Sequence, residues 1–267
     1  MEYELLSQLR QQNPVVLNIS NFVTVQDVAN GLNALGASPI MSQEIKETAA
    51  MVDIAQAVQL NLGAFTQTEV AHLRQMGITA NQAQRPVVLD PVAVGAIAYR
   101  LQVAQQLLQE MHVNIIRGNA GEIAALGGFA WQSQGIDAGQ GAGDLIEIAQ
   151  TTAQRFHCVV ILSGATDIVT DGQRVTKIYN GTPMLAVHVG SGDMLSSVTA
   201  AFAAVQSEDY YEAARMATLT FGTCGQLVMQ HQPDCGPGSF LPAFLDQLYQ
   251  IQVEELQQMA DFQEVRS

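Results

Sequence analysis

The chain has 267 residues, of which 48% are hydrophobic and 13% are charged, so it carries enough apolar side chains for a large core. Its formal net charge is −14 and its 11 basic residues are scattered, which argues against nucleic acid as a partner. The same negative charge would repel a nucleotide, so a phosphate-bearing ligand would need a divalent cation and locally placed N–H groups.

The chain shows no sign of export or of membrane insertion. Residues 1–10 are acidic and amphipathic, unlike a secretory signal, and no apolar run approaches the roughly 18 residues of a membrane span. Cys158, Cys224 and Cys235 have spacings that fit neither a zinc site nor a disulfide framework. We therefore expect a cytoplasmic protein with no membrane partner. Since no linker or repeat divides the sequence, residues 1–267 are expected to form one domain.

Short β-rich runs alternate with helical stretches along the first part of the chain. The predicted strands are residues 15–19, 38–41, 57–62, 87–90, 113–117 and 158–163. Amphipathic helices are predicted at residues 24–35, 99–111 and 145–155. This alternation predicts an α/β fold, with a mostly parallel central sheet flanked by helices on both faces.

The pattern changes after Ser163. Residues 167–170 and 174–179 are predicted to be two strands around a tight turn at Asp171-Gly172, which adds a late antiparallel hairpin. Residues 194–205, 210–229 and 239–248 are predicted helices.

Ligands of open α/β sheets bind beyond the carboxyl ends of the strands. The residues that follow the predicted strands are therefore the candidates for a site. They are Asn21, Met41, Ser42, Gly63, Asp90, Arg117 to Glu122, and Ser163.

The segment Gly190-Ser191-Gly192-Asp193 precedes a run of small and apolar residues. Its glycines allow a sharp turn with exposed N–H groups, and a helix that follows adds the positive end of its dipole, which together suit a phosphate group. Asp193 would then take a proton from a hydroxyl group that is being phosphorylated. An aspartate here is also a common helix N-cap, and this segment alone leaves both interpretations open.

Two further groups lie at predicted strand ends. Asp90 and Glu122 are carboxylates that suit hydrated Mg²⁺, and Arg117 suits phosphate oxygens. The pair Asn119 and Glu122 also has the spacing of a capping box. Each feature taken separately favours a structural role, but their coincidence on one sheet edge favours a site.

Familiar nucleotide signatures are absent from the sequence. No Gly-x-x-x-x-Gly-Lys-Ser/Thr motif occurs, and Gly190-Ser191-Gly192 lies too late in the chain for a dinucleotide fingerprint. The histidines show no metal-ligand spacing.

Several segments together resemble the hydroxyethylthiazole kinase family of the ribokinase-like superfamily. The resemblance runs through nearly the whole chain, and its most diagnostic part is Arg-Gly-Asn-Ala-Gly-Glu. The segments are residues 21–31, 35–41, 88–92, 116–126 and 236–240. The resemblance implies a ribokinase-like fold and ATP-dependent phosphorylation of the primary alcohol of 4-methyl-5-(2-hydroxyethyl)thiazole, a step towards thiamine.

The resemblance also implies roles for the residues at the turn before the late helix. Asp193 corresponds to the general base, with Gly190, Ser191 and Gly192 forming the hole for phosphoryl oxygens. It further implies a homotrimer with the site at a subunit interface.

The remaining site residues follow from the same resemblance. Arg117 and Ser163 correspond to ATP contacts, and Asp90 and Glu122 to groups that organise Mg²⁺. The thiazole pocket corresponds to Asn21, Val23, Met41 and Gly190.

The chain departs from the family pattern at a few positions. Asp193 stands where these kinases usually carry cysteine, Leu17 where many carry histidine, Ala93 where glycine follows Asp-Pro-Val, and Ser163 where threonine is usual. These departures leave open a kinase for another heteroaromatic alcohol, a pyrimidine or pyridine. A nucleotide-dependent dehydratase of the same superfamily and a non-catalytic ligand sensor are further alternatives.

Overall fold

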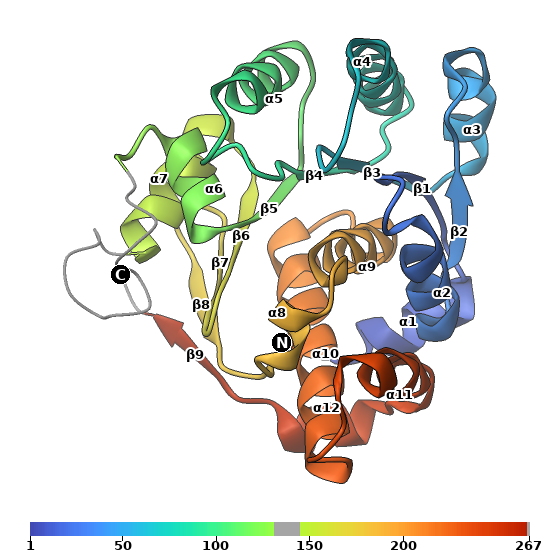
Figure 1. Cartoon of the computed structure of the whole chain (residues 1–267), viewed down its shortest axis with the longest axis vertical. Coiled ribbons are helices and arrows are strands. Elements are labelled where there is room, and N and C mark those ends of the chain that lie inside the picture. Colours follow the sequence, from blue (N-terminus) through green and yellow to red (C-terminus); the bar gives the residue numbers. More distant parts are fainter. Residues whose placement is uncertain (131–144, 266–267) are drawn as a thin grey trace.

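One mixed β-sheet runs through the middle of the molecule (Figure 1). In this computed structural model, which describes residues 1–130 and 145–265, the strand order is β2-β1-β3-β4-β5-β6-β7-β8-β9. The strands are β1 Val15–Ile19, β2 Ser38–Met41, β3 Ala57–Asn61, β4 Val87–Asp90, β5 Ile115–Asn119, β6 Val159–Ser163, β7 Asp167–Thr170, β8 Val175–Ile178 and β9 Phe262–Val265.

Strands β1 to β6 run parallel to one another, whereas β7, β8 and β9 join the sheet in antiparallel pairs. The expectation of a mostly parallel sheet with a late antiparallel hairpin, now β7 and β8, is confirmed. Strand β9 was not predicted, and β5 covers Ile115–Asn119 rather than residues 113–117.

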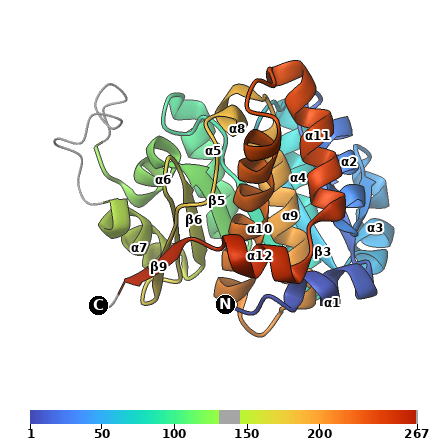
Figure 2. The same cartoon turned by 90° about the horizontal axis from the view of Figure 1, so that it is seen from below.

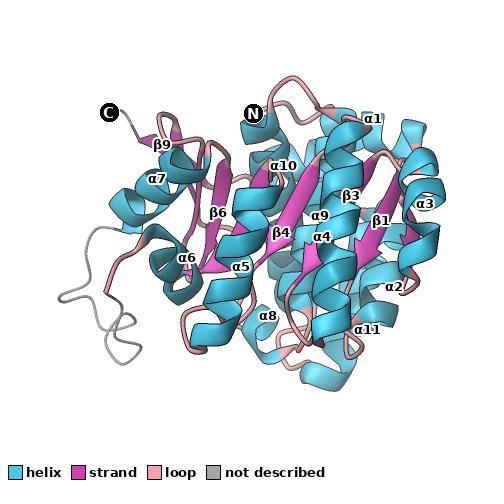
Figure 3. Ribbon diagram, turned by 90° about the horizontal axis from the view of Figure 1, so that it is seen from above, coloured by secondary structure: helices cyan, strands magenta, loops and turns pink. Residues whose placement is uncertain are grey.

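Helices cover both faces of the sheet (Figures 1 and 3). One face carries α3 Thr48–Ile54, α4 Gln67–Gln82, α5 Ala98–Glu110, α6 Ala120–Gly127 and α7 Leu145–Phe156, with the short 3-10 helix Ile45–Glu47 before α3. The other face, seen in Figure 2, carries α1 Leu5–Gln12, α2 Val25–Leu35, α8 Met184–Val187, α9 Ser191–Val205, α10 Tyr210–His231, α11 Pro237–Gln250 and α12 Val253–Met259. None of the helices in the described part of the chain is long and apolar enough to cross a membrane.

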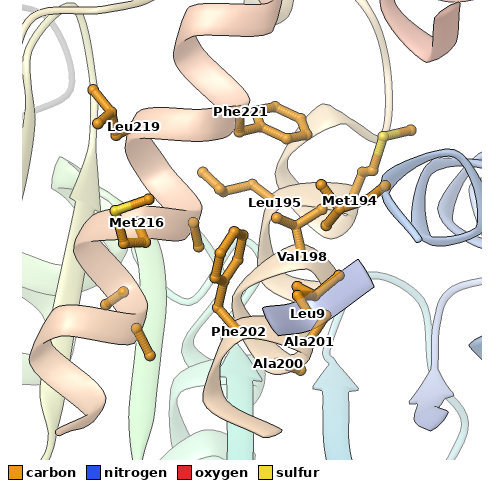
Figure 4. Packing of buried hydrophobic residues seen from close by; sticks show 14 of the residues in the cluster. Leu9, Met194, Leu195, Val198, Ala200, Ala201, Phe202, Met216, Leu219 and Phe221 are labelled. Carbon is orange, nitrogen blue, oxygen red and sulfur yellow. The ribbon is translucent and has the colours of Figure 1, made fainter. Parts of the chain in front are cut away.

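The two faces of the sheet have separate apolar cores because successive strand residues point to opposite sides. Val16 packs in the core beside α9 and α10, whereas its neighbour Leu17 packs in the core beneath α4 and α5. Figure 4 shows Phe202 of α9 and Phe221 of α10 within the first core. Small residues such as Ala200 and Ala201, both fully buried, let α9 lie close to its neighbours.

The strand order places a crevice beside β1. From β1 the chain passes to β2 on one side and then to β3 on the other, so the sheet has a topological switch point there. Such a point leaves a crevice at the carboxyl ends of the strands, where ligands bind.

Candidate active site

Polar side chains from neighbouring strands meet at the carboxyl edge of the sheet, on the face covered by α9. Asn61 of β3 is level with Asp90 of β4, and Arg117 belongs to β5. Asp90 and Val88 point to the same face because they alternate with Leu89, and Val88 lies in the α9 core. The sheet therefore brings these side chains beneath the start of α9.

Gly190 forms the turn before α9. Its φ of 99° lies in the left-handed region, and a Cβ atom on it would lie 2.6 Å from Cγ2 of Thr24. Gly190 is also the N-cap residue of α9, so Asp193 lies inside the first turn. The N-cap interpretation of Asp193 is therefore wrong. The first N–H groups of a helix lack intrahelical acceptors and favour a bound anion.

The Asp193 carboxylate accepts hydrogen bonds from β3 and from the start of α2. Thr24 Oγ1 donates to Oδ2 at 2.6 Å, and Gln59 Nε2 donates to Oδ1 at 2.9 Å. Burial raises the pKa of Asp193, while hydrogen bonds from Thr24, Ser20 and Gln59 and the charge of Arg117 lower it. The Ser20 hydroxyl has no hydrogen bond of normal geometry within the described residues.

Arg117 lies between two groups at the sheet edge. Its Nε donates to Ser163 Oγ at 3.1 Å, and its Nη1 lies 3.7 Å from Asp90 Oδ2. Ser196 of α9 also donates to Asp90 Oδ2, at 3.0 Å. Burial raises the pKa of Asp90 to about 7, with Arg117 lowering it and the charges of Glu122 and Asp193 raising it. The site thus concentrates negative charge around one guanidinium group.

Glu122 makes the capping box that the sequence suggested. Its Oε2 accepts from the N–H of Asn119 at 2.8 Å, and Asn119 Oδ1 accepts from the N–H of Glu122 at 3.0 Å. Its Oε1 accepts a bond from outside the helix, from the N–H of Ala93 at 2.8 Å. Ala93 has a φ of 63°, a left-handed conformation that favours glycine. Glu122 therefore has a structural role whether or not it also binds a ligand.

The carboxylates Asp90 and Glu122 fit a hydrated Mg²⁺. No group of three or more His, Cys, Asp or Glu side chains able to hold a metal occurs in residues 1–130 and 145–265. Mg²⁺ is commonly bound by one or two carboxylates together with water and phosphate oxygens. Glu122 is near enough to raise the pKa of Asp90, and a cation beside them would relieve this repulsion.

The residues predicted to line a substrate pocket lie beside the switch point. Asn21 follows β1, its Nδ2 donates to Asn61 Oδ1 at 3.3 Å, and its Oδ1 accepts from the N–H of Val23 at 3.0 Å. Val23 is 59% exposed and Met41, at the end of β2, is half-buried. Apolar side chains and the Asn21 amide therefore lie together beside the switch point.

Sequence reasoning missed Thr24, Gln59 and Ser196. Gln59 had a visible signal, because it is an amide within the apolar run Ala-Val-Gln-Leu-Asn of a buried strand. The other two looked like ordinary helix residues. Leu17, one of the departures from the family pattern, packs in the core on the opposite face of the sheet from the core that Met41 borders.

A separate hollow of about 480 Å³ lies beside Arg10, between the end of α2 and the end of α11. The guanidinium of Arg10 donates to the carbonyl groups of Leu35, Leu248, Tyr249 and Ile251. Its donors are already used by the backbone, so this hollow is a poor anion site.

The edge of the sheet therefore combines a buried carboxylate, a guanidinium group, a helix N-terminus and a pair of acids. These are the groups that phosphoryl transfer to an alcohol requires: a base, oxyanion donors and carboxylates for a cation.

The fold defines the broad class of the protein. A ribokinase-like superfamily protein from Enterococcus faecalis V583 superimposes with a TM-score of 0.62 at 13% identity, over 93% of this chain and 94% of that chain. The chain thus has the ribokinase-like α/β fold that the sequence predicted.

Closer similarities identify the family. A family model described as the hydroxyethylthiazole kinase family matches residues 6–254. A hydroxyethylthiazole kinase of Levilactobacillus brevis is 59% identical, over 98% of this chain and 100% of that protein. The solved structure of a hydroxyethylthiazole kinase protein from Pyrococcus horikoshii OT3 is 33% identical, with a TM-score of 0.90 over 99% of this chain and 98% of that chain. The chain belongs to the hydroxyethylthiazole kinase family.

Proposed function

We propose that this chain transfers a phosphoryl group from ATP to the primary alcohol of 4-methyl-5-(2-hydroxyethyl)thiazole, supplying thiazole phosphate for thiamine biosynthesis. The observation that carries the proposal is the position of Asp193, a buried carboxylate in the first turn of α9 beside Arg117, in a chain of this family.

Asp193 is the general base in this proposal. As the substrate oxygen attacks the γ-phosphorus of ATP, the O–H proton passes to the Asp193 carboxylate, the new O–P bond forms and ADP leaves with the electrons of the broken bond. A carboxylate is ionised at neutral pH, whereas the cysteine usual in the family is mostly protonated, so the substitution preserves a competent base.

The nucleotide lies along the other side of the site. Arg117 and Ser163 contact its phosphates, and the N–H groups of Gly190, Ser191 and Gly192 stabilise the transferring oxygens. The Ser191 Oγ donates to the Leu185 carbonyl at 2.5 Å, so Ser191 contributes to this hole through its backbone N–H in the proposal.

Asp90 and Glu122 would hold a Mg²⁺ ion that accompanies the nucleotide. The ion would supply positive charge to the phosphate oxygens, which a chain of net charge −14 otherwise lacks.

The thiazole ring lies against Asn21, Val23, Met41 and Gly190. Exposed apolar side chains surround this region, including Phe22 at 76%, Val23 at 59% and Val189 at 69% exposure. We propose that a second subunit of a homotrimer covers them and completes the pocket. Light scattering on the purified protein should give the mass of three chains, and a monomer that remains active would refute this arrangement.

The whole chain forms one kinase domain in this proposal. We place the protein in the cytoplasm, where ATP is available and where three unpaired cysteines are stable.

The test is direct. The protein is mixed with ATP, Mg²⁺ and the thiazole alcohol, and mass spectrometry follows ADP and the phosphorylated thiazole. We expect both products from the wild type and neither from Asp193→Asn, with thiazole binding retained in that variant. Turnover with a pyrimidine or pyridine alcohol but not with thiazole would overturn the substrate assignment.

A further inference from the structure

The Asp193 carboxylate accepts hydrogen bonds from side chains of two other elements. Thr24, the N-cap residue of α2, donates to one carboxylate oxygen, and Gln59 of β3 donates to the other. Both partners are buried, at 3% and 0% exposure. The two contacts fix the rotation of the carboxylate and leave a second acceptor position on each oxygen.

Neither partner is explained by its own secondary structure. The Thr24 side chain makes no capping hydrogen bond to α2. The other end of the Gln59 amide, Oε1, has no hydrogen-bond partner among the described residues. An unsatisfied amide oxygen in a buried strand costs stability. Val88 of β4 pairs with Gln59 across the two strands, so an apolar side chain is accommodated at this level of the sheet.

The contacts of these partners favour one protonation state of Asp193. The amide N–H₂ group of Gln59 donates and does not accept, so it stabilises an ionised carboxylate over a neutral one. The Thr24 hydroxyl donates to the same group at the short distance of 2.6 Å, which is typical of a bond to a charged acceptor.

We propose that Thr24 and Gln59 are positioning residues that keep Asp193 ionised and hold its carboxylate in one orientation, ready to take the proton of the substrate hydroxyl. This inference rests on the proposed function of Asp193. It gives Thr24 and Gln59 the role of positioning the carboxylate that acts as the base in this chain.

Other groups that face Asp193 also affect its pKa. Arg117 from β5 and the Ser20 hydroxyl after β1 lower the pKa of Asp193, whereas burial raises it. Asp90 on β4 is also a carboxylate, and like charges on Asp90 and Asp193 repel each other. Without Thr24 or Gln59, burial is less opposed, so the base should become protonated at a higher pH.

The experiment compares Thr24→Val and Gln59→Leu with the wild type. We expect kcat/KM for the thiazole alcohol at pH 7 to fall about tenfold or more, while KM for ATP stays within about twofold. The acidic limb of the kcat/KM profile should move to higher pH by about one unit, and raising the pH should recover part of the activity. Thr24→Ser, which keeps the hydroxyl, should restore the wild-type profile.

Asn18 offers a matched control for the loss of a buried amide. It lies level with Gln59 on β1 and is 1% exposed, but its Nδ2 donates to the Val16 carbonyl rather than to Asp193. Asn18→Leu should therefore leave the acidic limb unmoved. A profile that does not move in Thr24→Val or Gln59→Leu, or that moves equally in Asn18→Leu, would overturn the inference.

A second measurement separates this inference from the proposed function. The titration of the Asp193 carboxyl carbon by NMR, in protein without substrate, needs no turnover. A higher midpoint in Gln59→Leu supports the role of Gln59 even if the alcohol that the protein phosphorylates proves different. An unchanged midpoint refutes that role even if thiazole is phosphorylated. Full activity in Asp193→Asn would instead show that the proposed base is wrong.

Discussion

The guanidinium group of Arg117 occupies the space where a side chain on Gly192 would stand. A Cβ atom on Gly192 would lie 2.2 Å from Nη1 of Arg117. Ser163 accepts from its Nε at 3.1 Å and Asp90 Oδ2 lies 3.7 Å from its Nη1, and these two contacts hold the guanidinium group in this place. The absence of a side chain at residue 192 thus lets a cation from β5 approach the N-terminus of α9.

Gly192→Ala should therefore displace Arg117 without unfolding the protein. We expect KM for ATP to rise about tenfold, equivalent to about 1.4 kcal/mol, because the guanidinium loses its position for the phosphates. Gly181→Ala is the control, since a Cβ atom on Gly181 would meet nothing within 4 Å. Steady-state kinetics and circular dichroism of both variants check this. Wild-type kinetics in Gly192→Ala would contradict the role of Arg117.

Glu122→Gln separates the capping role of Glu122 from its role with Mg²⁺. A second capping box, formed by Thr66 and Glu69 at the start of α4, serves as the internal comparison. We expect Glu122→Gln to lower activity about tenfold or more and to raise the Mg²⁺ concentration for half-maximal rate. Glu69→Gln should change neither, because glutamine is accepted in a capping box. Equal Mg²⁺ dependence in the two variants would leave Glu122 with a structural role alone.

Ala93→Gly should stabilise the protein. Ala93 has a φ of 63°, a left-handed conformation that costs a residue with a Cβ roughly 1–2 kcal/mol. Glycine removes this strain but has more freedom in the unfolded chain, so we expect a net gain of about 1 kcal/mol in the free energy of unfolding. Ala96→Gly nearby, where no positive φ is involved, should be slightly destabilising. Urea denaturation compares the two, and a loss in both would refute the strain at Ala93.

Two aspartates should change stability with pH in opposite directions. Burial raises the pKa of Asp167 to about 6, opposed by the Gly164 N–H and by Arg117. The folded protein therefore binds this proton more tightly than the unfolded chain, so ionised Asp167 costs stability above about pH 6. Hydrogen bonds from Arg174 lower the pKa of Asp209, with burial opposing them. Asp209 therefore adds stability that is lost as pH falls through its folded pKa.

Asp167→Asn should thus raise the free energy of unfolding at pH 8, by up to about 1 kcal/mol because the side chain is only half-buried. This gain should shrink below about pH 6 and vanish near pH 3.8, the ordinary pKa of an aspartate side chain. Asp209→Asn should instead lower the free energy of unfolding at pH 8, by about 1 kcal/mol, and the loss should disappear in strong acid. Urea denaturation at several pH values checks both, and effects of the same sign would contradict the assignment.

Most of the fold could be predicted because its elements are local. The run Val-Val-Leu-Asp fixes β4, and the apolar spacing of residues 25–35 fixes α2, from residues that are neighbours in sequence. Strand β9 could not be predicted in this way. Phe262–Val265 becomes a strand by pairing with β8, and Arg215 of α10 donates to Glu264 at 2.6 Å, both of which are contacts between distant parts of the chain.

The candidate site, too, could be predicted from the sequence only in part. The positions of Asp90 and Ser163 could be predicted because each ends a strand, and parallel strands bring their ends to one edge. Arg117 lies two residues before the end of β5, close to the same edge. Asp193 could be identified as a candidate, but its sequence neighbours suited an N-cap equally well. The structure places Gly190 at the N-cap and turns the Asp193 side chain towards Gln59.

The sequence by itself determined the alternation of strands and helices, the late hairpin and the residue types available for phosphate chemistry, since these depend on local periodicity and composition. Only the tertiary structure decided which groups act on one another. Thr24, Gln59 and Asp193 are far apart in the chain, and their contact depends on α2 and α9 packing together on one face of the sheet. A hydrogen bond requires atoms within about 3 Å, and only folding brings them that close.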